Sequence, residues 1–496
     1  MEKKVMFLGT GSSVGKSILT AALCRIFYRK GYKVAPFKSQ NMALNSFVTK
    51  DGKEMGRAQV VQAEAAGLEP TVEMNPILLK PTTDIGSQVI LNGKVYKNLK
   101  AADYYLEKDY LKTVIMKSYN NLSSKHDVIM IEGAGGCAEI NLRDKDIVNM
   151  GLAEMIDAPV ILIGDIDRGG VFASIYGSFM LLEPEDRKRI KGFIINKFRG
   201  DVDLLTPGIK MLEEMIDIPC LGVIPHMELN IDDEDSVTHR FEGNKGSGIN
   251  IGIIKLPHIS NFSDFTPLEL EKDVNIKYIS SKGQMDDIDL ILIPGSKNTI
   301  DDMRFIFDRG IDQDIYRKYK SGTNIIGICG GYQILGREII DDNNVESSIN
   351  RINGLGLLNT KTIMAKEKST TQISGEFING FELLKDFEDM PVSGYEIHMG
   401  ETEIIANDVP AIRLENGKLD GTISKCGKIF GTYLHGIFEN DKFRNNILNY
   451  MREKKGLEMV AESIDYKSLK EREYDKLADT VSEHIDLTKI MEILEL

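Results

Sequence analysis

The sequence has few of the features expected of a secreted, membrane-spanning or nucleic-acid-binding protein. Its five cysteines are an odd number without a Cys-x-x-Cys pair, which favours a reducing compartment over a disulfide framework. No apolar run approaches the roughly 20 residues that cross a bilayer, and the N-terminal run ends at Gly9, before a signal peptide could form. The formal net charge of −14 argues against a nucleic-acid binder held by phosphate contacts. We therefore expect a cytoplasmic protein that binds neither membranes nor nucleic acids.

The sequence does contain short apolar runs that alternate with longer helical patterns, which is typical of parallel α/β domains. Candidate buried strands fall into two sets, at 5–8, 128–131, 160–163 and 193–195, and at 249–254, 290–293, 325–328 and 429–430. Because 229–248 is rich in Asp, Glu, Gly, Asn and Ser, we interpret it as a linker. The pattern predicts one domain at 1–228 and a second at 249–450. Apolar residues at helical spacing in 451–496, such as Leu477 and Val481, predict an amphipathic helical extension docked on the second domain.

A phosphate-binding loop follows the first predicted strand. The segment Gly9-Thr-Gly-Ser-Ser-Val-Gly-Lys16-Ser17 precedes a helical run, so the backbone N–H groups around Gly11 and Gly15 can surround a phosphate chain. Lys16 can reach the terminal phosphates, and Ser17 can bind Mg²⁺. The first glycine lies one residue further from Lys16 than in the standard loop, because Thr10 occupies the usual position.

Two other strand ends support a nucleoside triphosphate site. Glu132 ends the strand at 128–131 and precedes a glycine turn, which is where a metal-bridging carboxylate belongs. Asn196 follows another strand and is a candidate for reading a base edge. A dinucleotide site is an alternative because the loop contains Gly-x-Gly, but Lys-Ser at the helix start favours a triphosphate. A ParA- or MinD-like nucleotide-switch ATPase is another, although Thr10 and Gly11 stand where such proteins carry a second lysine.

The second half contains a candidate cysteine nucleophile. Cys329 lies between an apolar strand and Gly330-Gly331 at a helix start, the arrangement of a nucleophile elbow, where the helix dipole favours thiolate. Its best partner as a base is His435, which ends a strand and precedes a helix, and His398 is the rival. The backbone N–H groups of Gly330 and Gly295 are candidates for an oxyanion hole.

Six segments in the first half carry a resemblance to the cobyric acid synthase family. They contain Pro-Phe-Lys-Ser-Gln-Asn, Glu-Met-Gly-Arg, Met-Asn-Pro, Glu-Ile-Asn-Leu-Arg, Asp-Ile-Asp-Arg-Gly-Gly and Lys-Phe-Arg-Gly-Asp, within 36–45, 54–59, 74–81, 139–143, 165–170 and 197–201. This half resembles the dethiobiotin synthetase type of ATPase, whose loop has the same extra residue. The second half is similar to class I glutamine amidotransferases through 327–333 and 431–436. The resemblance implies two doubly wound domains, one like P-loop NTPases and one flavodoxin-like.

Two positions depart from these patterns. Class I amidotransferases usually place Glu two residues after the histidine, whereas Gly436 and Ile437 follow here and the first acid is Glu439. The cobyric acid synthases share this gap, so Cys329 and His435 are expected to work as a dyad, with Glu439 as a weak candidate for a third member. The second departure is Gly136-Cys137, where relatives more often carry Ser-Pro.

The resemblance implies ATP- and Mg²⁺-dependent amidation of the b, d, e and g carboxylates of adenosylcobyrinic acid a,c-diamide, with ammonia from glutamine. The a,c-diamide synthase, which acts on earlier carboxylates, is the enzymatic alternative, and a homo-oligomer is left open. Ser17 and Glu132 would hold the metal, and the ATP site would comprise Gly11, Gly15, Lys16, Ser17 and Asn196. The candidates for binding the corrinoid polycarboxylate are Lys38, Asn41, Arg57, Lys80, Arg143, Asp146, Arg168, Arg199, Tyr395 and His398.

Overall fold

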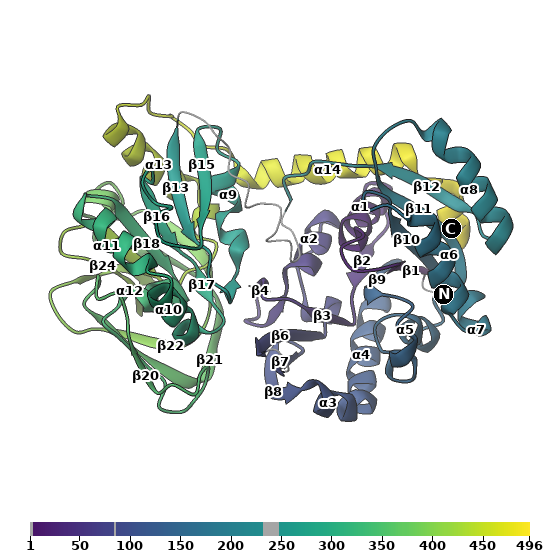
Figure 1. The fold of residues 1–496 in the computed structure, drawn as a ribbon, viewed down its shortest axis with the longest axis horizontal. Helices are drawn as coiled ribbons and strands as arrows, with labels where there is room; N and C mark the ends of the chain where they lie inside the picture. Colours follow the sequence, from purple (N-terminus) through teal and green to yellow (C-terminus); the bar gives the residue numbers. More distant parts are fainter. Residues whose placement is uncertain (1–2, 84–85, 232–247) are drawn as a thin grey trace. The chain divides into compact units, whose positions relative to one another are not determined.

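The computed structural model describes residues 3–83, 86–231 and 248–496, and the chain divides into two compact units (Figure 1). Unit 1 comprises Met1–Ala43, Met55–Glu234 and Ser468–Leu496, and unit 2 comprises Leu44–Glu54 and Asp235–Lys467. Each unit is an α/β fold whose main sheet contains a run of parallel strands, so the predicted fold class is confirmed. The predicted linker lies almost wholly outside the described residues.

The main sheet of unit 1 is parallel at every described pairing, in the order β12-β11-β10-β1-β9-β2. Its strands are largely apolar on both faces, which is the pattern of a sheet covered by helices on both sides. The four strands predicted in the first half are all present. The sheet consists of β1 (Lys3–Gly9), β2 (Val34–Phe37), β9 (Val128–Gly136), β10 (Val160–Asp165), β11 (Ile190–Phe198) and β12 (Cys220–Pro225).

Helices cover both faces of this sheet (Figure 1). Helix α1 (Lys16–Arg29) shares an apolar core with Ile161 and Ile163 of β10. On the opposite face, Ile175 of α6 (Val171–Leu181) packs over Gly164. The other helices of the unit are α2 (Arg57–Ala65), η1 (Val72–Met74), α3 (Ala101–Tyr104), η2 (Tyr105–Glu107), α4 (Lys108–Ser123), η3 (Ile140–Lys145), α5 (Met150–Met155), α7 (Pro184–Arg187) and α8 (Val202–Ile216). A smaller sheet contains β3 (Gln40–Met42), β6 (Ile77–Thr83), β7 (Gly86–Leu91) and β8 (Lys94–Lys100).

The main sheet of unit 2 joins a parallel half to a largely antiparallel half. The parallel half has the order β15-β13-β16-β18-β25 and contains the four strands predicted in the second part of the chain. Its members are β13 (Ile249–Ile254), β15 (Val274–Ile279), β16 (Leu290–Ile293), β18 (Asn324–Ile328) and β25 (Ile429–Thr432). The other half consists of β19 (Glu338–Ile340), β20 (Arg351–Asn353), β21 (Thr360–Phe377), β22 (Pro391–Ile404), β23 (Val409–Leu414) and β24 (Leu419–Ile423).

One apolar core joins this sheet to its helices. The helices are η4 (Phe262–Phe265), α9 (Thr266–Glu269), α10 (Thr299–Asp308), α11 (Ile311–Lys320), α12 (Gly330–Leu335), η5 (Glu382–Leu384), η6 (Ile437–Glu439) and α13 (Asp441–Lys455). One short pairing completes the unit: β14 (Ile259–Ser260) pairs with β17 (Gly295–Ser296). A separate two-stranded sheet consists of β4 (Ser46–Val48) and β5 (Glu54–Gly56).

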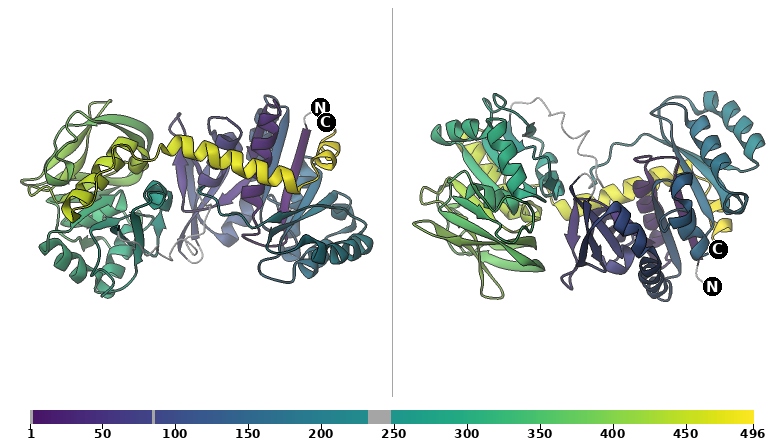
Figure 2. Two further views of the ribbon diagram at one scale, coloured as in Figure 1. Left: turned by 90° about the horizontal axis from the view of Figure 1, so that it is seen from above. Right: turned by 60° about the horizontal axis from the view of Figure 1, so that its bottom comes forward.

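The C-terminal helices are α14 (Tyr466–His484) and α15 (Leu487–Ile493), and their position differs from the prediction that 451–496 docks on the second domain. Leu477 and Val481 belong to the same apolar core as α1, and Arg25 of α1 pairs with Asp475 at 2.9 Å. Helix α14, seen in Figure 2, therefore packs against α1 within unit 1, and the predicted docking on the second domain is wrong. The amphipathic pattern predicted that one face is buried, but it carries no information on which domain provides the covering surface.

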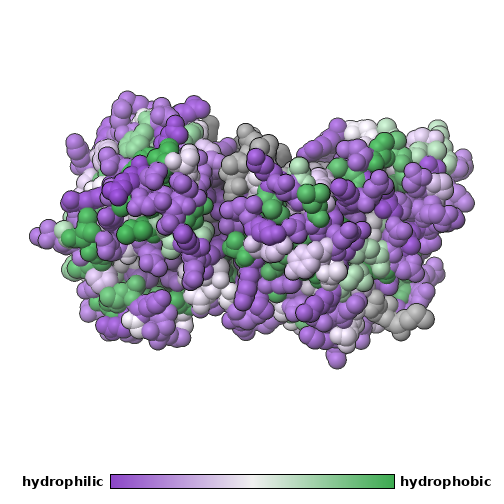
Figure 3. Space-filling model, turned by 90° about the horizontal axis from the view of Figure 1, so that it is seen from below, coloured by the Kyte–Doolittle hydropathy of each residue, from purple (hydrophilic) through white to green (hydrophobic). Residues whose placement is uncertain are grey.

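The exposed surface agrees with the composition. On the face seen in Figure 3, hydrophilic side chains predominate and apolar ones form small scattered groups. Within the described residues, no helix combines the length and apolarity that crossing a membrane requires.

Because α14 packs on unit 1, a substitution that leaves a cavity beneath α14 should destabilise unit 1 and not unit 2. Leu477→Ala removes a fully buried side chain and should destabilise unit 1 by about 2–5 kcal/mol. Hydrogen exchange should show faster opening of α1, while the amides of β18 and α12 keep their protection. The exposed Arg472 provides a matched control, since Arg472→Ala should change stability by less than about 0.5 kcal/mol. Faster exchange confined to unit 2 would contradict this assignment.

Candidate active sites

Cys329 lies on a strained turn between β18 and α12. Its φ is 52° and its ψ −108°, a backbone conformation that a non-glycine residue adopts only when its surroundings enforce it. The enforcement comes from close packing: a Cβ on Gly331 would collide with the carbonyl of Ile293, and a Cβ on Gly327 with the backbone of Gly331. The predicted elbow is thus present, and the thiol sits at the helix start, only 5% exposed.

His435 is held by a buried carboxylate. Asp264 of η4 lies 2.7 Å from Nδ1 of His435 and accepts the backbone N–H of Gly436 at 2.8 Å. Burial alone would lower the pKa of His435, but the charges of Asp264 and of the nearby Cys329 outweigh it and raise the pKa to about 10. Nε2 of His435 has no hydrogen-bond partner of regular geometry among the described residues, although it lies close enough to Cys329 for the sulfur to affect its pKa.

The two predicted oxyanion glycines also lie beside this pair. A Cβ on Gly295 would be 3.1 Å from Cε1 of His435, and a Cβ on Gly330 would be 2.7 Å from the backbone nitrogen of Ser296. The turn that contains Gly295 and Ser296 is anchored by Asp302, a fully buried residue of α10 that accepts a 2.6 Å hydrogen bond from the Ser296 hydroxyl. The structure therefore brings together all the side chains and turns that a cysteine amidase requires.

Tyr395 and His398 occupy this site as well, on β22. Tyr395 exchanges two backbone hydrogen bonds with His435, and their rings stack with centroids 5.4 Å apart. The ring of His398 stacks on Tyr433 at 3.7 Å. The structure thus places both residues near the Cys329 turn, and their predicted part in corrinoid binding stays a prediction. His435 is the better candidate for the base, because Cys329 acts on its pKa, whereas His398 stacks on Tyr433 and its Nδ1 is bonded to the carbonyl of Gly400 at 2.8 Å.

A cavity of about 650 Å³ opens beside helix α12 in the same unit. Its lining includes His398, Tyr433 and the acidic side chains of Glu396, Glu401 and Asp420. Burial raises the pKa of Asp420 to about 6, against the lowering effect of hydrogen bonds from Thr432 and the Tyr433 backbone. A cavity with several carboxyl groups suits a ligand that carries an ammonium group.

The phosphate loop of unit 1 has the predicted geometry. Gly15 has a φ of 97°, a conformation that glycine adopts without strain, and it precedes α1 directly. Nζ of Lys16 folds back over the loop to the carbonyl of Gly135 at 2.8 Å and to that of Gly11 at 3.2 Å. The lysine therefore points into the turn where phosphate oxygens would lie.

Glu132 is the centre of a buried polar cluster next to this loop. Its carboxylate accepts hydrogen bonds from the Ser17 hydroxyl at 2.8 Å, from Lys38 Nζ at 2.9 Å and from the amide of Gln62 at 2.6 Å. Hydroxyl and carboxylate oxygens are the donors that Mg²⁺ prefers, so Ser17 and Glu132 fit the predicted metal. Within the described residues no group of three or more His, Cys, Asp or Glu side chains could hold a metal by itself, so phosphate oxygens would have to complete the coordination.

Comparison with known proteins gives a matching family model for each half of the chain. A model of the CobQ/CobB/MinD/ParA nucleotide binding domain matches residues 5–236, and a model of the CobB/CobQ-like glutamine amidotransferase domain matches 250–443. A curated cobyric acid synthase from Thermoanaerobacter sp. is 52% identical, with coverage of 100% of this chain and 99% of the relative. Cobyric acid synthases from Alkaliphilus metalliredigens and Clostridium acetobutylicum are 52% and 51% identical, and each comparison covers 99% of this chain and at least 98% of the relative.

The chain belongs to the cobyric acid synthase family. Its two matched domains make it an ATP-dependent, glutamine-hydrolysing amidating enzyme, which excludes the nucleotide-switch ATPase.

Asn196 lies beside the phosphate loop in an unexpected role. It is buried, and its amide nitrogen donates to the carbonyl of Val14 at 2.8 Å. A Cβ on Gly15 would collide with the same amide. This contact shows Asn196 supporting the loop, while its predicted role in reading the adenine stays a prediction.

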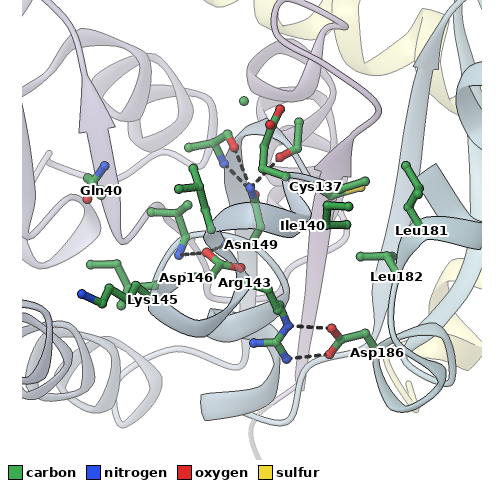
Figure 4. A pocket seen from close by; sticks show the side chains of 18 of the residues that line it. Gln40, Cys137, Ile140, Arg143, Lys145, Asp146, Asn149, Leu181, Leu182 and Asp186 are labelled. Atoms are coloured by element: carbon green, nitrogen blue, oxygen red, sulfur yellow. Dashed lines mark hydrogen bonds and ion pairs between the residues drawn. The ribbon is translucent and has the colours of Figure 1, made fainter. Parts of the chain in front are cut away.

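Arg143 and Asp146 line a cavity of about 280 Å³ in unit 1, shown in Figure 4. Arg143 makes two hydrogen bonds to Asp186, at 2.7 and 2.8 Å, and Asp146 accepts backbone N–H groups from residues 148, 149 and 151. Both therefore shape the wall of the cavity. Lys108, which the sequence analysis missed, lines the same cavity, and burial lowers its pKa to about 8.

The other basic candidates fall into a buried and an exposed group. Lys38, Arg57 and Lys80 are each at most 4% exposed, and the buried Asn41 donates to Gln59 at 3.1 Å. By contrast, the side chains of Arg168 and Arg199 are 68% and 61% exposed. The structure thus does not gather all six cations at one surface.

Asp264 is the functional candidate that the sequence analysis missed. It lies in the segment Ser260-Asn-Phe-Ser-Asp264, shortly after strand β13 of the main sheet of unit 2. The sequence does contain a signal for Asp264, because it follows the predicted strand β13. The ends of β13 and β25 lie at one edge of a parallel sheet, where an acid from one loop can reach a histidine from another. Glu439, the weak candidate, does not hold Nδ1 of His435, because Asp264 does.

Replacing Asp264 should separate the two candidates for a third member. Asp264→Asn removes the charge that raises the pKa of His435, so that pKa should fall and glutaminase kcat should decrease by about 10²–10⁴-fold. KM for glutamine should change much less, because the carboxylate does not face the cavity. Glu439→Gln serves as the matched control and should retain kcat within about threefold. The reverse order of effects would assign the role to Glu439.

Proposed function

We propose that this chain amidates the b, d, e and g side-chain carboxylates of adenosylcobyrinic acid a,c-diamide to give adenosylcobyric acid, with consumption of ATP and glutamine. The full-length identity of about 50% to curated cobyric acid synthases carries this proposal. The assembled Cys329–His435–Asp264 group in one unit and the Lys16 loop in the other support it. The composition that favours a reducing compartment supports a cytoplasmic location, and oligomeric state stays open.

In the glutaminase unit, the Cys329 sulfur attacks the carboxamide carbon of glutamine. The backbone N–H groups of Gly295 and Gly330 stabilise the oxyanion, and His435 gives a proton to the departing ammonia, which leaves a glutamyl thioester. A water molecule then gives a proton to His435 and attacks the thioester, so that glutamate and the thiol are released. Asp264 keeps Nδ1 protonated, which directs Nε2 towards the reacting atoms.

In the synthetase unit, a substrate carboxylate oxygen attacks the γ-phosphorus of ATP, and ADP leaves. Lys16 and the loop N–H groups neutralise the charge of the transferred phosphoryl group. Ser17 and Glu132 would hold Mg²⁺, which supplies further charge neutralisation at the phosphates when bound. Ammonia then replaces phosphate at the acyl carbon and forms the amide. Lys38, Arg57, Lys80 and Asp146 remain candidates for orienting the corrinoid carboxylates.

Two substitutions should separate ammonia release from the ATP-dependent amidation step. Cys329→Ala should abolish glutamine-dependent amidation and retain amidation with ammonium salts, because only ammonia release needs the thiol. Lys16→Ala should reduce amidation from either nitrogen source by at least about 10²-fold, because the lost cation acts on the phosphoryl transfer that both share. The measurement is product formation with each nitrogen source. Loss of ammonium-dependent amidation in a folded Cys329→Ala enzyme would refute this division of labour.

The substrate is tested directly by mass spectrometry of reactions that contain ATP, Mg²⁺, glutamine and one corrinoid. With the a,c-diamide, four successive replacements of a hydroxyl by an amino group are expected. Amidation of the a,c-diacid precursor instead would move the assignment to the a,c-diamide synthase. Inertness towards both would reject a corrinoid substrate and leave only the general amidotransferase activity.

A further inference from the structure

A short segment of the first half of the chain is built into the glutaminase unit. Residues Leu44–Glu54 belong to unit 2, although the chain on both sides, up to Ala43 and from Met55, belongs to unit 1. Polar residues of the segment that are almost completely buried make hydrogen bonds and an ion pair within unit 2. Asn45 and Ser46 are fully buried, and Glu54 is 1% exposed.

The first part of the segment holds the turn that carries Asp264. The Ser263 hydroxyl donates to the Asn45 side chain at 3.0 Å, and the Asn261 amide donates to the carbonyl of Ser46 at 2.8 Å. Asn261 has a φ of 52°, so the turn adopts a conformation that its contacts must maintain. The position of Asp264, and through it that of His435, therefore depends on residues 45 and 46.

The same part of the segment also packs against Tyr395. The Tyr395 hydroxyl donates to the carbonyl of Ser46 at 3.2 Å, the rings of Phe47 and Tyr395 lie 5.3 Å apart, and Val48 joins Tyr395 in an apolar cluster. Tyr395 in turn stacks on His435. The segment thus contacts the turn that carries Asp264, through Asn261 and Ser263, and it contacts Tyr395, the stacking partner of His435.

The returning part is fixed to strand β21. The Gln372 amide donates to the carbonyl of Val48, the Thr370 hydroxyl donates to the carbonyl of Gly52 at 2.9 Å, and Lys368 pairs with Glu54 at 2.5 Å. These contacts all come from one strand of the glutaminase unit.

The residues that flank the segment in the chain belong to unit 1 and surround Glu132 there. Just before it, Lys38 pairs with Glu132, and just after it, Gln59 and Gln62 donate to the same carboxylate. Asn41, which precedes the segment, donates a 3.1 Å hydrogen bond to Gln59, which follows it, so the two flanking stretches are linked directly. If Glu132 bound a metal and nucleotide instead, Lys38, Gln59 and Gln62 would lose this partner. These residues lie only a few positions before Asn45 and after Glu54 in the chain.

We propose that Leu44–Glu54 couples the two reactions: occupancy of the ATP and carboxylate site shifts this segment, and the segment then aligns Asp264 and Tyr395 on His435. This inference rests on the proposed function. Residues 45–48 act as positioning residues, since they touch neither nitrogen donor nor phosphate. Glutamine hydrolysis is thereby favoured when an acceptor is ready to use the ammonia.

The test uses the full-length enzyme and measures glutamate release with glutamine alone and with added ATP, Mg²⁺ and the a,c-diamide. In the wild type, the additions should raise the rate by at least about fivefold. Ser263→Ala and Gln372→Ala each remove one anchor of the segment and should reduce this ratio towards one. The matched control is Thr371→Val on the same strand, whose hydroxyl bonds to the carbonyl of Gln372 and not to the segment, and it should keep the wild-type ratio.

Ammonium-dependent amidation by each variant, measured alongside, shows that the synthetase unit is folded and tests the proposed function separately. A loss of the ratio in both anchor variants, with this amidation retained, supports the inference. A wild-type ratio of one, or an unchanged ratio in both anchor variants, overturns it while the proposed function stands. Failure of the wild type to amidate with ammonium overturns both.

Discussion

Both candidate sites depend on one constraint of parallel sheets, which is that every strand presents its carboxyl end at the same edge. In unit 1, the phosphate loop after β1, Glu132 on β9 and Asn196 on β11 are brought to one edge by this rule. In unit 2, the same rule brings together the turn after β16, Cys329 after β18 and His435 after β25. Residues separated by 100 positions or more therefore become neighbours without any specific pairing in the sequence.

Burial then determines the charge states at these edges. The pair of Asp264 and His435 is almost completely excluded from solvent, and a lone buried imidazolium would be unstable. The carboxylate compensates for the lost hydration, and it fixes the tautomer and the direction of the ring. Glu132 illustrates the same physics, since its buried carboxylate is satisfied by an ammonium, a hydroxyl and an amide that a metal could replace.

The strained backbone at Cys329 and the segment Leu44–Glu54 are two ways in which packing prepares the glutaminase site. The elbow is maintained by close contacts between glycines and the neighbouring strand, which leave no space for a Cβ. The segment is maintained by hydrogen bonds to the turn and strands around His435. In each case the orientation of a candidate catalytic group is provided by neighbouring residues that have no proposed part in the chemistry.

Much of the fold and the chemical type of each site could be predicted from the sequence. Buried strands, the loop at Lys16 and the elbow at Cys329 are encoded locally, because apolar runs, glycines and the residues that follow them act over a few positions. Asp264, the cluster around Glu132 and the docking of α14 on unit 1 could not be predicted in the same way. Each depends on contacts between residues 70 to 450 positions apart, and a periodic pattern indicates that a surface is buried without specifying its partner. The sequence by itself determined the reaction type and the candidate nucleophile. Only the tertiary structure decided which carboxylate supports His435 and which domain each segment joins, because burial and charge pairing are properties of the folded chain.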